Sequence, residues 1–541
     1  MNINPLWYKN AIFYQIYPRS FYDSNGDGYG DFQGIIQKLD YVRNLGTDCI
    51  WLMPTYKSPL KDDGYDISDF YGVFEPFGTL DDLKQLFYEI HQRGMRVITD
   101  LVLNHCSDQH PWFQSARKDP NSKYRNYFVW SDTDTKYQRT RIIFVDSQKS
   151  NWTWDEEAGA YYWHRFYPSQ PDLNYDNPEV REEMKNVMRY WLNLGIDGFR
   201  ADAVPYLFER EGTINENLPE THAYLKEIRK MMDLEFPGTI LLCEANQWPQ
   251  DVREYFGDGD EFQLGFHFPL MPRIFMSIGK QDASSLVQIM QETPEIPENC
   301  QWSTFLRNHD ELTLEMVSEE DRQWMWAFYA PQKEMRLNLG IRRRLYPLLD
   351  NDRKKIGLAF SLIFTLPGSP VLYYGDEIGM GDNINLFDRN GVRTPMQWDG
   401  TKNGGFSTAD RTYLPAITDE EYGYQKVNVK QQEDDPDSNL NWLRRLIRIR
   451  KASEALGVGE LEWITTGSEV KVLAYIRRSE NDLVYVIHNM SDYPMHFQLD
   501  FEPGIYTDLI QPDFTIVGNQ DTELDLNPRI FYWLQRKKSI G

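Results

Sequence analysis

The sequence predicts an α/β protein: a (β/α)8 barrel with an inserted subdomain after its third strand, followed by an all-β domain. Three observations lead to this fold class. The chain has 541 residues, which suggests about two to four domains. Short apolar runs alternate with amphipathic stretches over most of the chain, as in βα units around a parallel sheet. From about residue 455 this alternation gives way to segments of period two, which indicates a separate β domain.

Eight short runs that are apolar, β-branched or aromatic are the predicted barrel strands. In chain order they are AIFYQIY (11–17), CIWLMP (49–54), RVITDLVLN (96–104), GFRADAV (198–204), TILLCEA (239–245), LGFHFPL (264–270), STFLRN (303–308) and PVLYYG (370–375). The helices between them have readable ends. Thr79 opens one as in a capping box, and Gly46, Gly94 and Gly195 follow helical runs as stops. Eight such units form a TIM-type barrel.

Two stretches are too long to be simple loops of a barrel. Residues 105–172, rich in Trp, Tyr, Asp and Ser, are predicted to form an inserted subdomain. Residues 311–350 form a helical extension that carries the basic run Gly340-Ile-Arg-Arg-Arg-Leu, either as a lid or with a solvated basic face. The predicted domains are therefore a barrel of residues 1–104 and 173–454, the 105–172 subdomain and a β-sandwich of residues 455–541.

Composition excludes several classes of protein. The chain has 57 Lys and Arg against 82 Asp and Glu, a net charge of −25, so nucleic acid and anionic membranes are not expected partners. Apolar stretches stay well below about 18 residues and the N-terminus lacks a signal-peptide pattern, which predicts a cytoplasmic protein. The 4 cysteines show no CxxC spacing, so neither a disulfide framework nor a zinc site is predicted.

Polar residues gather at the predicted C-terminal ends of strands, where barrel enzymes carry their chemistry. The fourth strand ends in Arg200-Ala-Asp202, whose period of two points both side chains to one face, so the guanidinium helps keep the carboxylate ionised as a nucleophile. Glu244 ends an otherwise apolar strand, a setting that raises the pKa of a carboxyl and keeps it protonated as an acid. Two carboxylates in different environments are what cleavage of a glycosidic bond requires.

Four stretches resemble the four sequence regions of the α-amylase family, glycoside hydrolase family 13, in order and spacing. They are DLVLNH, GFRADAV, the Glu244 strand and RNHD, and the resemblance covers essentially the whole chain. Gln170-Pro-Asp-Leu-Asn174 is similar to the fifth region of the branch that holds oligo-1,6-glucosidases, sucrose isomerases and trehalose synthases. Longer stretches, among them SDQHPWFQ, EANQWP and NLGIRRRLYPLLDNDR, resemble the trehalose synthases, which are maltose glucosylmutases. The resemblance implies an isomerase that interconverts maltose and trehalose with retention of configuration.

The resemblance also implies roles for individual residues. Asp202 would be the nucleophile, Glu244 the acid/base and Asp310 the stabiliser of the transition state. The glucosyl ring would be held by Asp66, His105, Arg200 and His309, with Phe144 and Gln170 at its wall. Arg393 would pair with Asp66 and close the far end of the ring, which gives a pocket that accepts a chain end.

One or two structural calcium ions are expected, and no organic cofactor. The segment Asp23-Ser-Asn25-Gly-Asp27-Gly-Tyr29-Gly-Asp31 offers oxygen ligands at alternate positions with glycines for tight turning, as in a calcium loop; a capped polar turn is the alternative. The resemblance implies that Tyr29 contributes its carbonyl, and leaves open whether Ca²⁺ or Mg²⁺ binds. It also implies a second calcium site made by Asn104, Asp172, Glu209 and the carbonyls of Tyr206 and Leu207.

Other functions stay open at this point. An α-glucosidase or oligo-1,6-glucosidase of the same branch would share every catalytic residue, and only the longer stretches favour the mutase. A non-catalytic subunit of an amino-acid transporter would predict lost carboxylates and a transmembrane helix. The resemblance implies a homo-oligomer. The sequence leaves open the extent of hydrolysis, the heat stability, the role of the C-terminal domain and whether a maltokinase is a partner.

Overall fold

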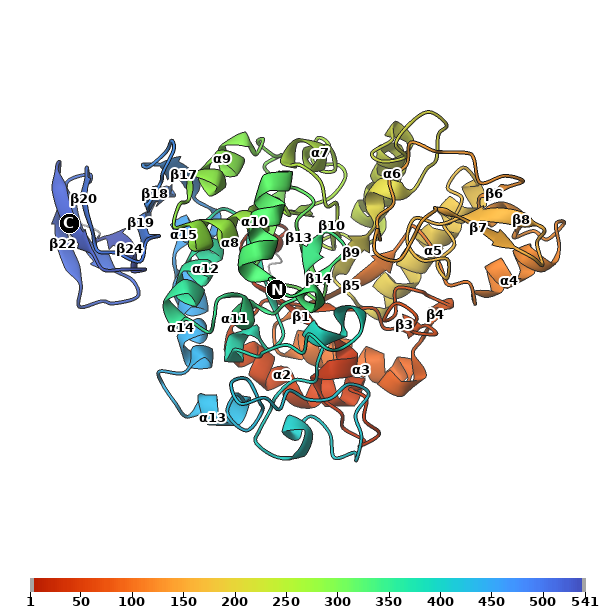
Figure 1. The fold of residues 1–541 in the computed structure, drawn as a ribbon, viewed down its shortest axis with the longest axis horizontal. Coiled ribbons are helices and arrows are strands. Elements are labelled where there is room, and N and C mark those ends of the chain that lie inside the picture. Colours follow the sequence, from red (N-terminus) through yellow and green to blue (C-terminus); the bar gives the residue numbers. More distant parts are fainter. Residues whose placement is uncertain (1–3, 538–541) are drawn as a thin grey trace.

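A closed parallel barrel forms the centre of this computed structural model, which describes residues 4–537 (Figure 1). The strand order around the barrel is β1-β16-β12-β11-β10-β9-β5-β2. The strands are β1 (Phe13–Ile16), β2 (Cys49–Leu52), β5 (Arg96–Val102), β9 (Gly198–Asp202), β10 (Ile240–Cys243), β11 (Leu264–Phe266), β12 (Gln301–Phe305) and β16 (Ser369–Tyr373). Each overlaps one of the eight predicted runs, so the predicted barrel is confirmed.

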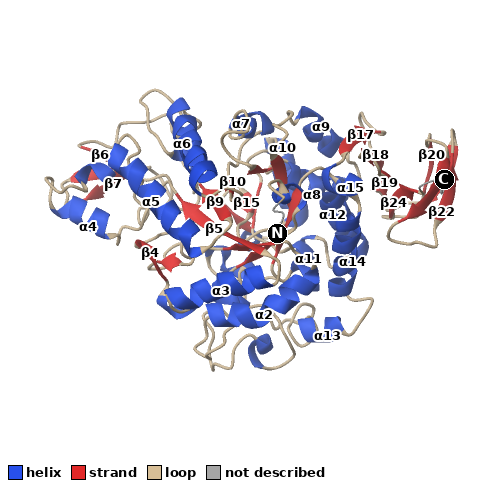
Figure 2. Ribbon diagram, turned by 180° about the vertical axis from the view of Figure 1, so that it is seen from behind, coloured by secondary structure: helices blue, strands red, loops and turns tan. Residues whose placement is uncertain are grey.

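Helices surround the strands on the outside (Figure 2). The longer ones are α2 (Phe32–Leu45), α3 (Leu80–Gln92), α5 (Pro178–Leu194), α6 (Pro219–Glu235), α8 (Leu270–Lys280), α9 (Ser284–Glu292), α12 (Arg353–Thr365) and α14 (Asn439–Ala452). Shorter ones are α1 (Pro18–Phe21), α7 (Pro249–Glu254), α13 (Val429–Glu433) and α15 (Glu454–Val458). Thr79 and Asp82 form the predicted capping box of α3. Gly46 ends α2 with a φ of 101°, a left-handed conformation that favours glycine.

Two additions rise from the carboxyl ends of the barrel strands. Between β5 and β9 the chain forms α4 (Pro111–Lys118) and a small sheet of β6 (Trp130–Ser131), β8 (Ala160–Trp163) and β7 (Trp152–Asp155). Between β12 and β16 it forms α10 (Glu319–Tyr329), α11 (Leu345–Leu348) and a sheet of β13 (Leu312–Thr313), β15 (Gly340–Ile341) and β14 (Arg336–Leu337). The 311–350 excursion is therefore not the purely helical extension predicted, because its middle pairs into strands. A hairpin of β3 (Tyr56–Lys57) and β4 (Asp69–Val73) lies beside the inserted subdomain.

The C-terminal region is an all-β domain, as predicted. One sheet has the order β17 (Glu460–Trp463), β18 (Val472–Arg478), β19 (Leu483–Asn489), β24 (Phe531–Arg536), β21 (Gly504–Asp508), β22 (Thr515–Gly518), and a second pairs β20 (Met495–Leu499) with β23 (Thr522–Leu526). The domain packs against α12, where Ser361 Oγ lies 2.8 Å from both His488 Nε2 and Trp533 Nε1. In Figure 1 it lies at the opposite end of the molecule from the inserted subdomain. Over residues 4–537, a search for a helix able to cross a membrane finds none.

Candidate active site

Arg200 is the centre of the floor of the site. Its side chain is 1% exposed, and its Nη1 lies 2.8 Å from Asp202 Oδ1 and also contacts Asp100 Oδ1. Its Nη2 contacts Glu244 Oε1. The parallel register places Asp100 of β5 directly beside Arg200 of β9. One buried guanidinium therefore holds three carboxylates from three neighbouring strands, and the period of two in Arg200-Ala-Asp202 produces the predicted side-by-side arrangement.

The two carboxyls of Asp202 and Glu244 have different pKa values. Burial raises the pKa of Glu244 to about 8 and that of Asp202 to about 6, and Arg200 opposes both shifts. A hydrogen bond between the two groups favours the anion on Asp202 and the proton on Glu244. At pH 7 the acid is therefore Glu244 and the anion is Asp202. The apolar setting of Glu244 acts in the predicted direction, whereas burial of Asp202 outweighs the effect of Arg200 on its pKa.

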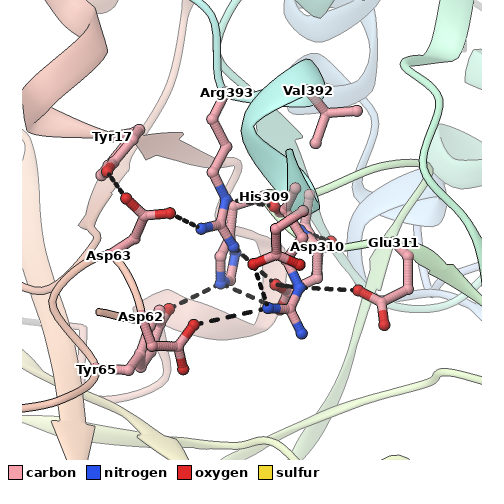
Figure 3. Close-up of polar contacts among 12 residues, drawn as sticks. Tyr17, Asp62, Asp63, Tyr65, His309, Asp310, Glu311, Val392 and Arg393 are labelled. Atoms are coloured by element: carbon pink, nitrogen blue, oxygen red, sulfur yellow. Dashed lines mark hydrogen bonds and ion pairs between the residues drawn. The ribbon is translucent and has the colours of Figure 1, made fainter. Parts of the chain in front are cut away.

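Asp310 lies on the opposite side and is held by two arginines from the loop after β16. Its Oδ1 lies 3.0 Å from Arg393 Nη2 and 3.0 Å from Arg389 Nε. Arg393 also donates to the carbonyl of His309 at 2.8 Å. In Figure 3 the Arg393 side chain reaches between Asp310 and Asp63. The third carboxylate is thus fixed in direction by cations that themselves belong to the wall of the site.

His309 is buried beneath this group. Its ring stacks on Tyr65 at 5.5 Å between centroids, and Nε2 lies 2.8 Å from the Tyr65 hydroxyl. Burial and the surrounding arginines lower the pKa of His309 well below its usual value, so the ring is neutral. Burial likewise lowers the pKa of His105 to about 3. Both rings can exchange hydrogen bonds with a neutral sugar without adding charge.

The predicted pair of Arg393 with Asp66 is wrong. Asp66 is buried within its own turn, where its carboxylate accepts hydrogen bonds from Ser58 Oγ at 2.9 Å and from the backbone N–H groups of Lys61 at 2.9 Å and Asp62 at 3.0 Å. Asp63 takes the predicted role by contacting Arg393. The segment Asp62-Asp63-Gly-Tyr-Asp66 contains three carboxylates, and only the folded turn decides which of them faces the arginine.

A pocket lies above the carboxylates. Among the residues predicted from the sequence, those that line it are Asp202, Glu244, Asp310, His105, Phe144, Tyr206 and Arg393. Arg200 and His309 lie beneath the lining. Gln170 lies behind it, with Nε2 2.9 Å from Asp62 Oδ2 and 3.2 Å from His105 Nε2. The structure therefore brings most of the predicted set into one place and moves Asp66 and Gln170 out of the wall.

Several lining residues were missed in the sequence. They are Asp62, Asn246, Glu311, Thr313, Glu315 and Arg389. Glu311 directly follows the predicted Asp310, and Arg389 stands four positions before Arg393 in a loop that contains glycine, so proximity in sequence was the available signal for both. Glu315 had no such signal, because its approach to the pocket depends on the β13 turn.

One contact joins three segments above the pocket. Arg141 of the inserted subdomain lies 2.6 Å from Glu315 Oε2 of the 311–350 excursion. Its Nε lies 2.8 Å from Glu216 Oε1, and its Nη2 lies 3.2 Å from the Tyr206 hydroxyl. The inserted subdomain, the excursion and the loop after β9 thus meet at one guanidinium beside the pocket mouth.

Three buried oxygens at the base of the inserted subdomain have no hydrogen-bond partner. They are Asn104 Oδ1, Asp172 Oδ2 and Glu209 Oε1. Burial raises the pKa of Asp172 well above its usual range, and burial together with repulsion from Asp172 does the same for Glu209. A calcium ion would supply the missing partner, so this donor set fits the predicted second site. A search of residues 4–537 for three or more His, Cys, Asp or Glu around a metal finds none, and here the third ligand is an amide.

The Asp23–Asp31 loop closes on itself. The Asp23 carboxylate accepts from the backbone N–H groups of Asn25 at 3.1 Å, Gly26 at 2.7 Å and Gly28 at 2.8 Å. Asp31 caps α2 by accepting from the Gly34 N–H at 2.6 Å. These bonds explain the loop as a capped polar turn without a cation, although the donor set matches calcium chemistry. Calcium in this loop therefore stays a prediction.

Comparisons with known proteins agree with this geometry. The chain matches the family model for the α-amylase catalytic domain over residues 15–333 and 342–459, and that for the maltogenic amylase C-terminal domain over 464–533. It is 54% identical to the trehalose synthase/amylase TreS of Mycobacterium tuberculosis H37Rv, over 98% of this chain and 90% of that protein. It is 51% identical to the trehalose synthase of Pimelobacter sp. R48, over 98% and 96%. The structure of the trehalulose synthase MutB in complex with Tris covers 98% of this chain with a TM-score of 0.80 at 29% identity.

Proposed function

This chain belongs to the α-amylase family, and from that premise we propose that it is an intramolecular glucosyltransferase that interconverts maltose and trehalose with retention of configuration. The observation that carries the proposal is the pair Asp202 and Glu244, in contact at the bottom of a pocket with the proton on Glu244 and the charge on Asp202. The near full-length similarity to trehalose synthases selects the mutase over the hydrolases, whose catalytic residues would be the same.

The reaction proceeds by two displacements at the anomeric carbon. Glu244 gives its proton to the linking oxygen as the glycosidic bond breaks, and Asp202 Oδ forms a covalent bond to that carbon. The released glucose turns within the pocket. Glu244 then takes the proton from the anomeric hydroxyl of this glucose, whose oxygen attacks and displaces Asp202. Two inversions leave the α configuration unchanged.

Isomerisation requires that glucose stays and that water stays out while the covalent intermediate exists. The contact between Arg141 and Glu315 supports this part of the proposal, because it closes the inserted subdomain against the 311–350 excursion beside the pocket. The two additions act as a lid in this proposal. A lid held by an ion pair can open for exchange of substrate and product.

The test is to incubate the purified protein with maltose and, separately, with trehalose, and to identify the sugars by NMR. We expect each disaccharide to give the other, with glucose as a minor product. Glucose alone from both would refute the mutase and leave a hydrolase. Asp202→Asn should abolish both activities, since the nucleophile is lost, and retained turnover in that variant would contradict its role.

Calcium is proposed at the three unpartnered oxygens of Asn104, Asp172 and Glu209, with the carbonyls of Tyr206 and Leu207 completing the set. These residues would hold the ion, whose charge would offset the two buried carboxylates. The proposed role is structural: it would tie the end of β5 to the inserted subdomain and to the turn after β9. The catalytic steps above use only protein carboxylates.

Maltose and trehalose are the proposed small-molecule partners, and a cytoplasmic homo-oligomer remains our expectation from the family resemblance. Light scattering coupled to size-exclusion chromatography measures the oligomeric state directly. A mass equal to the 64.0 kDa of one chain would contradict it.

A further inference from the structure

The three consecutive arginines of the basic run all face the loop after β16. Arg343 Nε lies 3.0 Å from both carboxylate oxygens of Asp382. Arg344 is wholly buried, and its Nη1 donates to the carbonyl of Tyr374 at 2.8 Å. The solvated basic face considered for this run is therefore not what forms. The run is instead directed at the segment that connects β16 to the pocket.

Arg342 makes a different kind of contact from its two neighbours, because all its acceptors are backbone carbonyls. Its Nη2 donates to Ile384 at 2.8 Å, and its Nη1 donates to Leu386 at 2.7 Å and also to Asp388. Its Nε donates to Glu334 within its own excursion at 2.7 Å. One planar guanidinium thus holds every second carbonyl of the loop from 384 to 388.

This loop has little else to hold its shape. The side chain of Phe387 is 86% exposed, so the tip gains no burial from its largest apolar group. Asp388 has a φ of 50°, a left-handed conformation that is unfavourable for a residue other than glycine. The carbonyl that Arg342 binds belongs to this residue. The hydrogen bonds of Arg342 therefore maintain a backbone conformation that the loop does not favour by itself.

The residue after Asp388 is Arg389, which enters the pocket wall. Its Nε lies 2.9 Å from Glu311 Oε2 and 3.0 Å from Asp310 Oδ1. Its guanidinium lies over the ring of Phe144, 5.0 Å from the centroid, and so reaches the inserted subdomain. The position of Arg389 follows from the position of the peptide before it, and that peptide is fixed by Arg342.

We propose that Arg342 is a positioning residue for the reaction: it holds the 384–388 loop so that Arg389 closes the pocket between Asp310 and Phe144. Arg342 touches no part of the pocket lining and acts through Arg389. Because Arg389 joins the barrel to the inserted subdomain, loss of this support lets water compete with glucose for the covalent intermediate. The inference rests on the proposed function, since it concerns how that intermediate is partitioned.

The test compares Arg342→Ala and Arg342→Lys with the wild type in maltose. Lysine keeps the charge but offers one nitrogen, which cannot reach carbonyls that the three guanidinium nitrogens span. We expect both variants to lower the trehalose-to-glucose product ratio by about fivefold or more and to raise KM for maltose by about three- to tenfold, with a smaller change in kcat. If the alanine variant does not fold, the lysine variant still decides the question.

The matched control is Arg336→Lys. Arg336 also donates to backbone carbonyls, those of Ala330 at 2.8 Å and Trp326 at 3.4 Å, but these lie within the same excursion and not in the loop after β16. We expect this variant to keep the wild-type ratio. A ratio and a KM within twofold of wild type in Arg342→Lys would overturn the inference.

A double-mutant cycle with Arg389→Lys separates positioning from a general loss of stability. If Arg342 acts through Arg389, the double variant is no worse than the poorer single variant; independent, additive effects would contradict the inference. A wild-type protein that forms no trehalose would refute the proposed function instead. The KM comparison would then decide the role of Arg342 on the hydrolytic reaction.

Discussion

At the scale of single residues, the chemistry depends on how one buried cation is shared. Arg200 contacts Asp100, Asp202 and Glu244, yet the two catalytic carboxyls keep pKa values on either side of neutrality. Burial is the larger influence on both, and their mutual hydrogen bond separates them. The assignment of nucleophile and acid therefore follows from local dielectric and contact and does not depend on the residue types alone.

The pH dependence of kcat/KM follows from this separation. Asp202 must be ionised, so activity should rise as pH increases through about 6, and Glu244 must be protonated, so activity should fall as pH increases through about 8. We expect a bell-shaped profile with a maximum near pH 7, measured with maltose at low concentration. A profile that stays level up to pH 10 would show that Glu244 is not the acid.

Asp66 and Asp62 should differ in what they affect. Asp66→Ala leaves two backbone N–H groups and the Ser58 hydroxyl without their acceptor, which costs about 1–3 kcal/mol for each buried group left unsatisfied and lowers the thermal unfolding midpoint. Asp62→Asn, at the pocket lining, should raise KM with little change in that midpoint. Equal loss of stability in both variants would contradict the roles that the structure assigns to them.

At the scale of elements, the barrel strands supply the reacting groups and the two additions control access to them. The inserted subdomain contributes Phe144 and Arg141, and the excursion after β12 contributes Glu315. Neither addition completes the pocket alone. The contacts between them are few and polar, so they form an interface that can open.

The contact between Arg141 and Glu315 should control the loss of intermediate to water. We expect Arg141→Ala to raise the fraction of glucose among the products of maltose by about three- to tenfold, because the lid closes less often. Arg139→Ala is the control: Arg139 donates to the carbonyl of Gly212 at 2.7 Å on the exposed surface of the same subdomain. An unchanged product ratio in Arg141→Ala would show that this contact does not exclude water.

Calcium removal should act on the base of the inserted subdomain. We expect a chelator to lower the thermal unfolding midpoint of the wild type, with recovery on adding Ca²⁺, because the Asp172 and Glu209 carboxylates lose their counter-charge. The variant Asp172→Asn should lose this response, whereas Asp23→Asn tests the first loop by the same measurement. A wild-type midpoint that is insensitive to chelator would remove both calcium proposals.

At the scale of the whole molecule, the active site lies in the middle of a long particle. The C-terminal domain packs on α12 at one end and the inserted subdomain lies at the other (Figure 1). Direct contact of the C-terminal domain with the pocket is therefore excluded for the described residues, since those lining the pocket fall between 62 and 393. Its visible role is to cover the buried face of α12.

The sequence by itself determined the barrel, the β domain and the two central carboxylates. These depend on short-range order: a strand of period two places Arg200 beside Asp202, and an apolar run ending in Glu244 forecasts a raised pKa. Where the pattern was local, as at the capping box of Thr79, the prediction was confirmed.

Only the tertiary structure decided which carboxylate meets Arg393, what the basic run does and how the pocket is closed. Asp63 and Arg393 are 330 positions apart, and Arg141 and Glu315 are 174 apart. Contacts over such separations depend on how independent loops are placed by the barrel, and three carboxylates in one turn are equivalent until the turn is folded. For that reason the reacting residues could be predicted from the sequence, whereas the means of keeping water from them could not.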